Sequence, residues 1–124
     1  MQILTIRELV GIAVLHGQAD KPLMLCDNGE VFSFPRLVDI SFRFGRVIIS
    51  AKTCIMAEDI DSVGVDDCIT PVVLLRYCDQ FGFADKPLVI SDSSGLGYYV
   101  TSDSHVPEWE RFVIDISVCF ARRI

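Results

Sequence analysis

Two arginines and two aspartates recur at matching places in two similar stretches, residues 38–46 and 114–122, and are the first candidates for ligand chemistry. The guanidinium groups of Arg46 and Arg122, together with that of Arg43, would suit a phosphate or a carboxylate if they face one groove. A guanidinium donates two parallel hydrogen bonds to such a group. A salt bridge within each stretch is an equally simple interpretation.

The two aspartates, Asp39 and Asp115, lie in matching Asp-Ile-Ser tripeptides. Paired carboxylates can bind a metal ion or carry out acid–base catalysis. Each of them falls on the polar side of a stretch of alternating hydrophobicity, where an aspartate ordinarily faces solvent. We therefore favour a structural role for this pair.

Acidic side chains are densest between residues 57 and 67, where they form a second candidate site. The default interpretation is a solvated linker. The alternative is a docking surface for a protein partner that has a basic, nucleic-acid-binding surface, because the summed field of such a cluster steers a partner of opposite charge. The carboxylates are those of Glu58, Asp59, Asp61, Asp66 and Asp67.

Three aromatic residues in the second half, Tyr98, Tyr99 and Trp109, complete this candidate protein-binding surface. Rigid amphipathic rings often anchor protein interfaces. They lie in or beside residues 96–106, which we interpret as an insertion into the second half, and a departure from a repeat is a natural place for new function. Ordinary packing in a strand and the core is an equally favoured interpretation.

The residue types most often used in catalysis show no catalytic pattern. His16 and His105 are the only histidines, and five cysteines are scattered without the spacing of a zinc or redox motif. Most cysteines have apolar neighbours, which indicates reduced structural thiols. A cysteine- or carboxylate-dependent enzyme is our last hypothesis, and we predict no catalytic residue, no metal site and no cofactor.

The segment 91–97 is rich in serine and glycine, as phosphate-binding loops are. Such loops are followed by a helix, whose first N–H groups and positive dipole end face the phosphate. Here a strand-like segment, residues 98–101, follows instead. The pattern favours a wide hairpin loop.

The composition of the chain limits the kinds of partner. Its 124 residues have the length of one domain, and a formal net charge of −6 argues against direct binding of nucleic acid. Apolar residues make up 51% of the chain, which favours a homo-oligomer such as a dimer, or a permanent protein partner. There is no membrane-spanning run and no secretion signal, so we expect a cytoplasmic protein.

The similar stretches belong to a longer internal repeat. A shift of 65 residues superimposes residues 19–23 on 84–88 with identity at all five positions. After the inferred insertion, residues 38–46 align with 114–122. Two matched blocks in the same order predict a tandem duplication within the single domain 1–124.

The copies span approximately residues 3–50 and 68–124, joined by the acidic linker 57–67. Each begins with a helix. Thr5 is a good N-cap whose capping box is completed by Glu8. Thr70 caps the second helix and Pro71 occupies its first position, where the missing N–H costs nothing.

Short strands follow each helix, and the turn signal Asp27-Asn28-Gly29 predicts a hairpin. The fold class is therefore predicted to be α+β, with a helix-plus-β-meander unit in each copy, two helices packed on an antiparallel sheet and a pseudo-twofold axis. The strands are expected at residues 23–26, 30–34, 38–44, 46–50, 88–91, 98–101 and 112–120.

The capped helix that begins at Thr5, the chain break at residues 19–22 and the turn at residues 27–29 resemble those of small proteins common in bacteriophages and prophages. Some of those proteins inhibit host defence, anti-CRISPR proteins among them. The resemblance covers about the first half of each copy and carries no functional residue with it. It implies action inside a bacterial host cell.

These observations lead to three hypotheses of function. The first is a non-enzymatic protein of the phage or mobile-element kind that occludes a partner protein of host defence. The second is a protein that holds a small anionic ligand or nucleotide with Arg43, Arg46 or Arg122. An arginine cluster facing a concave groove would favour the second, and a flat acidic surface the first. The enzyme comes third.

Overall fold

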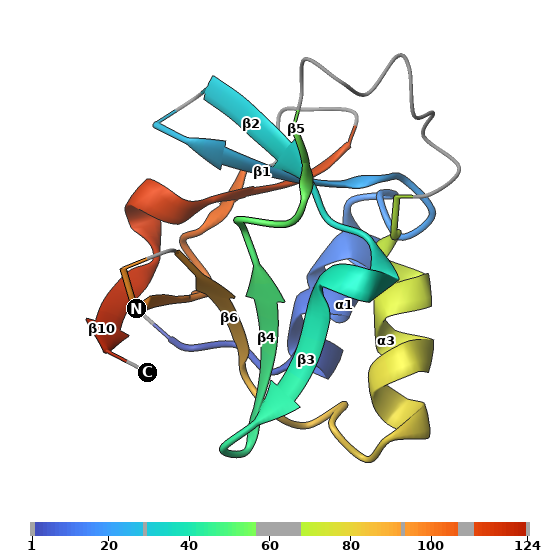
Figure 1. The fold of residues 1–124 in the computed structure, drawn as a ribbon. Helices are drawn as coiled ribbons and strands as arrows, with labels where there is room; N and C mark the ends of the chain where they lie inside the picture. The colour runs from blue at the N-terminus through green and yellow to red at the C-terminus, as the bar shows by residue number, and fades with distance from the viewer. Residues whose placement is uncertain (1, 29, 57–67, 93, 107–110, 124) are drawn as a thin grey trace.

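The computed structural model describes residues 2–28, 30–56, 68–92, 94–106 and 111–123. It has an α+β fold with two helices and two five-stranded sheets, which confirms the predicted fold class at this level (Figure 1). No described helix is long and apolar enough to cross a membrane.

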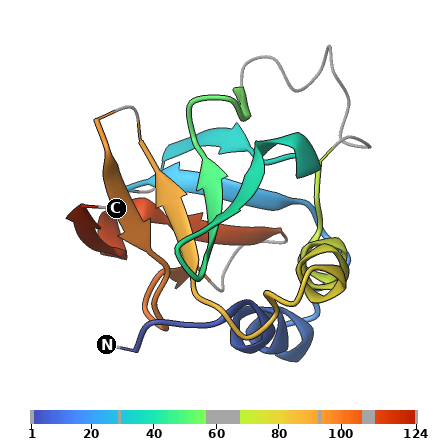
Figure 2. The ribbon, with the colours of Figure 1, turned by 60° about the horizontal axis from the view of Figure 1, so that its bottom comes forward.

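Both helices begin at the predicted caps. Helix α1 (Ile6–Leu15) starts after Thr5, whose hydroxyl accepts a hydrogen bond from the Glu8 N–H at 3.2 Å while the Glu8 carboxylate accepts one from the Thr5 N–H at 3.0 Å. Helix α3 (Pro71–Gln80) starts after Thr70, whose hydroxyl accepts a hydrogen bond from the Val73 N–H at 3.2 Å. The helices pack against each other on one flank of the molecule, as Figure 2 shows.

The strands form two mixed sheets rather than one antiparallel sheet. The first has the order β5 (Ile55–Met56), β2 (Glu30–Phe34), β1 (Leu23–Asp27), β9 (Phe112–Asp115) and β8 (His105–Val106). The second has the order β10 (Phe120–Arg123), β7 (Leu96–Tyr99), β6 (Leu88–Ser91), β4 (Arg46–Ser50) and β3 (Ile40–Arg43).

Each sheet contains strands from both halves of the chain. Strand β9 of the second half runs parallel to β1, and strand β4 of the first half runs parallel to β6. A parallel pair needs a long crossover connection, which the rest of the chain supplies here. The predicted antiparallel sheet was wrong at these two pairs, because a local pattern of alternating residues does not reveal which strand lies beside which.

A constant offset of 65 residues relates the elements. It carries α1 onto α3, and it carries the pair Leu23 and Phe112 of β1 and β9 onto the pair Leu88 and Val47 of β6 and β4. The same offset carries β9 onto residues 47–50 of β4 without an insertion at 96–106, and it therefore differs from the sequence alignment of 38–46 with 114–122.

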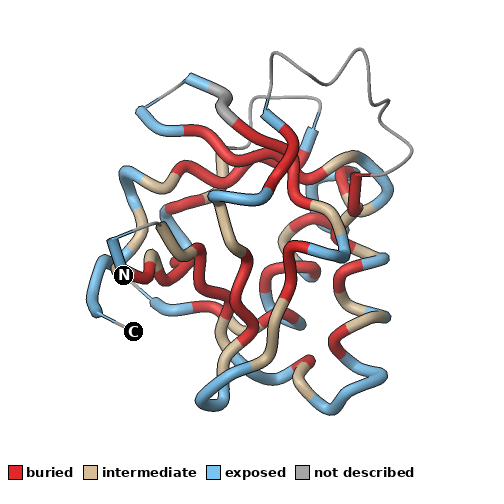
Figure 3. Tube along the Cα trace, viewed as in Figure 1, coloured by how far each residue is buried: buried red, intermediate tan, exposed pale blue. Residues whose placement is uncertain are grey.

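The main core lies between the inner faces of the two sheets and the helices. It contains Ile6 and Leu9 of α1, Leu74 of α3, and alternate strand residues such as Leu25 and Ile49, all at most 1% exposed. Figure 3 shows the buried segments running through the central strands, with exposed turns at their ends. Because strand side chains alternate, the residues between these core positions point to the outer faces.

The expected strand 38–44 differs from the observed structure. Leu37–Asp39 is a 3₁₀ turn, only Ile40–Arg43 forms a strand, and Val38 is 79% exposed. The turn rotates Asp39 into the protein, where its carboxylate accepts hydrogen bonds from the Thr53 hydroxyl at 2.6 Å and the Arg36 N–H at 2.8 Å. The expectation that Asp39 faces solvent was therefore wrong.

Candidate functional site

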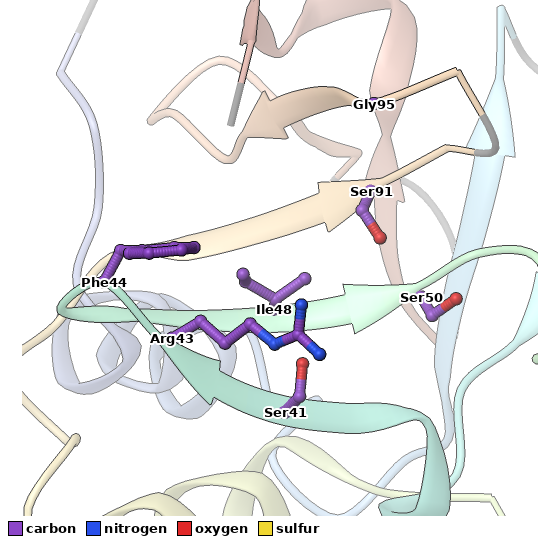
Figure 4. Close-up of a pocket in the computed structure, with 7 residues that line it drawn as sticks. All are labelled: Ser41, Arg43, Phe44, Ile48, Ser50, Ser91 and Gly95. Atoms are coloured by element: carbon purple, nitrogen blue, oxygen red, sulfur yellow. The ribbon is translucent and has the colours of Figure 1, made fainter.

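A pocket of about 360 Å³ opens on the outer face of the second sheet. Figure 4 shows the exposed ring of Phe44 at one end, the Arg43 guanidinium above Ser41 in the middle, and the remaining serines at the other end. The lining residues are Ser41, Arg43, Phe44, Ile48, Ser50, Ser91 and Gly95.

Strand pairing places the polar side chains of the pocket together. Ser41 on β3 lies opposite Ile48 on β4, and Ser50 at the end of β4 lies beside Ser91 at the end of β6. Within the described part of the chain the hydroxyls of Ser41 and Ser50 make no hydrogen bond, and that of Ser91 makes only a long one, 3.5 Å, to the Ile49 carbonyl. All three can donate to a ligand.

Two arginines flank the turn that closes one end of the pocket. Arg43 and Arg46 are direct cross-strand partners in the β3–β4 hairpin, so their side chains emerge on the same face. Like charges in such a pair repel each other. The turn between them consists of Phe44 (φ 53°) and Gly45 (φ 69°).

A left-handed backbone is costly for Phe44, by about 1–2 kcal/mol relative to the ordinary region, whereas glycine or asparagine accepts it easily. The side chain is 77% exposed, so burial does not offset this cost. Phe44 is therefore a residue that neither the turn nor the core favours.

The guanidinium of Arg46 also lies over the ring of Tyr99, 5.5 Å from its centroid, and that of Arg122 lies 5.9 Å from the same centroid. Tyr99 is 4% exposed, and its hydroxyl has no hydrogen-bond partner in the described part of the chain. The arginines that the sequence put forward, Arg43, Arg46 and Arg122, thus all occur on one sheet face.

None of these three arginines is paired with a carboxylate of the described residues. The ion pairs there join Arg7 to Asp79 and Asp85, and Arg36 to Asp39. The salt-bridge interpretation of Arg46 and Arg122 therefore finds no support in the described residues.

Asp115 takes part in local structure instead. Its Oδ1 accepts hydrogen bonds from the Asn28 N–H at 3.0 Å, the Ser117 N–H at 3.0 Å and the Ser117 hydroxyl at 2.6 Å. Burial raises the pKa of Asp115, but the hydrogen bonds from Ser117 and Asn28 outweigh it, so the pKa lies below its ordinary value. The two aspartates share no hydrogen-bond partner, because Asp39 binds Thr53 and Arg36.

The lowered pKa leads to a pH dependence. Ionised Asp115 should stabilise the fold at pH values above the pKa of the unfolded chain, near 3.8, and this contribution should be lost as the pH falls through the lower pKa of the folded state. Urea unfolding of Asp115→Asn at pH 3 to 7 should show a deficit that grows with pH. Asp103→Asn, at an exposed carboxylate with no described hydrogen bond, is the control, and an equal pH-dependent deficit there would contradict the assignment.

The outer face of the first sheet differs from that of the second. It carries a buried apolar cluster that includes Met24, Cys26, Phe34 and Val113. The 65-residue offset places Cys26 in the position of Ser91 and Val113 in that of Ile48. The polar pocket therefore reflects residues particular to the second sheet rather than a general property of the fold.

Of the aromatic residues in the predicted protein-binding surface that the structure describes, Tyr99 is buried and Tyr98 is half-buried. Tyr98 packs against the main core and donates its hydroxyl to Asp92 at 3.2 Å, and Tyr99 lies beneath the arginines. Burial and the Asp92 carboxylate raise the pKa of Tyr98. Trp109 and the acidic residues Glu58, Asp59, Asp61, Asp66 and Asp67 lie outside the described residues.

The side chains of the two histidines lie in contact, although these residues are far apart in the sequence. The ring centroids of His16 and His105 are 4.8 Å apart, and His105 Nε2 forms a 2.8 Å hydrogen bond with the Gln18 amide oxygen. Among the described residues no group of three or more His, Cys, Asp or Glu side chains could hold a metal ion.

Burial raises the pKa of the thiols of Cys54 and Cys78 to about 12 and that of Cys119 to about 11. At pH 7.5 only a very small fraction of Cys119 would therefore be the thiolate, which is the reactive form. We expect the native protein to resist iodoacetamide for hours and the urea-unfolded protein to react at all five cysteines. Rapid stoichiometric labelling of a native thiol, located by mass spectrometry, would revive the cysteine-enzyme hypothesis.

Sequence reasoning missed Phe44, Ser41 and Ser50, and it set Ser91 aside together with the segment 91–97 as part of a hairpin loop. The available signal was the serine that ends each of the segments 46–50 and 88–91. That signal can be interpreted only once β4 and β6 are known to be neighbours.

No protein-family model, curated protein or solved structure matches this chain, so the proposals below rest on its own geometry.

Proposed function

We propose that this protein is a non-enzymatic binder of a small anionic ligand, held on the outer face of the second sheet. One observation carries the proposal: Arg43 lines a pocket that is rich in serine hydroxyls, and neither it nor the two arginines over Tyr99 on the same face, Arg46 and Arg122, has a described carboxylate partner.

The charges favour an anion at this place. The chain carries a formal net charge of −6, yet two arginines are cross-strand partners in one hairpin and two guanidinium groups lie over one tyrosine ring. A phosphate or carboxylate between them would relieve the repulsion, and charge-assisted hydrogen bonds to it are about twice as strong as neutral ones. Such a ligand therefore stabilises the arrangement that binds it.

The pocket also has the size and lining of a ligand site. Its volume, about 360 Å³, falls within the range of small-molecule pockets. Ile48 supplies an apolar floor, and Ser41, Ser50 and Ser91 supply donors that can orient a ligand.

A titration with sodium pyrophosphate, followed by ¹⁵N NMR, tests the proposal. We expect saturable shifts at the amides of Ser41, Arg43, Ser50 and Ser91, and a smaller response at the exposed basic residues of α1 and α3. Shifts that stay linear, or that spread evenly over all exposed lysines and arginines, would reject a specific anion site.

Occlusion of a protein partner, in the cytoplasm of a bacterial cell, is the second proposal. Exposed apolar side chains favour it: Leu15 is 82% exposed and Val38 is 79% exposed. Native mass spectrometry and sedimentation of the wild type and of Val38→Asp test whether such side chains support a homodimer. If the wild type were a monomer at all concentrations, the homodimer would be rejected. If Val38→Asp formed the same dimer as the wild type, Val38 would not lie in the interface.

We also infer that the chain arose by tandem duplication and has a pseudo-twofold axis. The constant offset of 65 residues supports this inference, because it converts the strand order of the first sheet into that of the second. It also relates two cation–π pairs, Arg46 over Tyr99 and Arg111 over Phe34.

A further inference from the structure

We infer that the anionic ligand is a nucleoside phosphate, with its base stacked on Phe44 and its phosphoryl group between Arg43 and the serine hydroxyls. The inference rests on the proposed function, since it assigns a chemical class to the ligand of the same site. It adds a role for Phe44, which a simple anion site would not use.

The backbone conformation of Phe44 is unfavourable, and burial of its side chain does not offset the unfavourable free energy. Its ring is 77% exposed, and its backbone has the positive φ that a two-residue hairpin turn ordinarily gives to asparagine or glycine. Residues held in such conformations cluster at ligand-binding sites. A flat, exposed ring at the rim of a pocket is suited to stack against another flat ring.

The two ends of the pocket differ in chemistry, as do the base and the phosphoryl group of a nucleotide. Phe44 and the side chain of Ile48 offer an aromatic and an apolar surface, whereas Ser50 and Ser91 offer hydroxyls at the opposite end, with the Arg43 guanidinium between them (Figure 4). Bases stack on exposed aromatic rings regardless of sequence. Phosphoryl oxygens accept hydrogen bonds from arginine and from hydroxyl groups.

Smaller anions fit this lining less well. Inorganic phosphate or a sugar phosphate would satisfy Arg43 and the serines but would leave the Phe44 ring exposed to water. The additional apolar contact should therefore appear as tighter binding of a ligand that carries a base.

Calorimetric titrations with AMP, ribose 5-phosphate and sodium phosphate test this assignment on the whole chain. We expect AMP to bind at least about fivefold more tightly than ribose 5-phosphate, which is the lower end of what one base stacked on an aromatic ring contributes. Equal affinity for the two would overturn the nucleoside assignment while leaving the anion site intact. No binding of any of the three would reject the proposed function itself.

The variant Phe44→Asn separates a binding role from a structural one. Asparagine suits the turn, so the variant should melt at the same temperature as the wild type or higher, and it should lose the preference for AMP while keeping its affinity for ribose 5-phosphate. Phe44→Trp should restore the preference. Phe120→Ala, at an exposed ring on the opposite edge strand β10, is the matched control. An Asn variant that melts lower and binds AMP normally would show that Phe44 is structural.

Discussion

Replacing Arg43 by glutamine is expected to weaken binding of pyrophosphate by about 10- to 100-fold without changing the melting temperature. A charge-assisted hydrogen bond contributes about 1.5–3 kcal/mol, and each 1.4 kcal/mol is a factor of ten in affinity. The fold should not respond, because the Arg43 side chain is exposed and makes no described hydrogen bond or ion pair. Isothermal titration calorimetry and a thermal melt measure both effects.

Two further variants make this result specific. Arg76→Gln removes the same charge from an exposed position on α3 and should leave the affinity within about twofold, since screening limits the effect of a distant charge. Arg43→Lys keeps the charge but loses the planar pair of donors, and it should bind with intermediate affinity. If Arg43→Gln and Arg76→Gln weakened binding equally, the anion would be attracted by general charge and not held in the pocket.

Breaking the chain within residues 57–67 is expected to give two fragments that fold only together. Each sheet takes strands from both halves, and the pairs β1–β9 and β4–β6 are central in their sheets. A fragment alone would expose the backbone groups of β1 or β6 and the apolar residues that those strands bury, such as Leu25 or Ile90, each of which contributes about 1.5–3 kcal/mol when buried. Separate fragments should therefore lack cooperative unfolding.

Co-expression of the two fragments, with an affinity tag on one, is the measurement. We expect them to purify in equal amounts and to show one cooperative thermal transition. As a control, the intact chain carrying a protease site in the same segment should keep its melt after cleavage. If either fragment alone gave a cooperative melt as a monomer, the two halves would be independent units and the exchange of strands would not hold the protein together.

Local chemistry determined part of this protein from the sequence alone. The helix starts at Thr5 and Thr70 followed from capping, in which neighbours along the chain satisfy free N–H groups. The hairpin around Asn28 and the identity of Arg43, Arg46 and Arg122 as candidate ligands also came from the sequence. The structure brings these arginines to one face, but their role in binding remains a prediction.

Only the tertiary structure decided which strands are neighbours. Strand pairing joins residues about 90 or 40 positions apart, such as Leu23 with Phe112 and Val47 with Leu88, and alternation along one strand carries no information about its partner. The Asp-Ile-Ser match reflects similar tripeptides in different structural settings, because Asp39 lies in the 3₁₀ turn before β3 and Asp115 is the last residue of β9. The pocket arises where Ser50 meets Ser91 across that pairing, so its geometry was set by long-range contacts and not by any local signal.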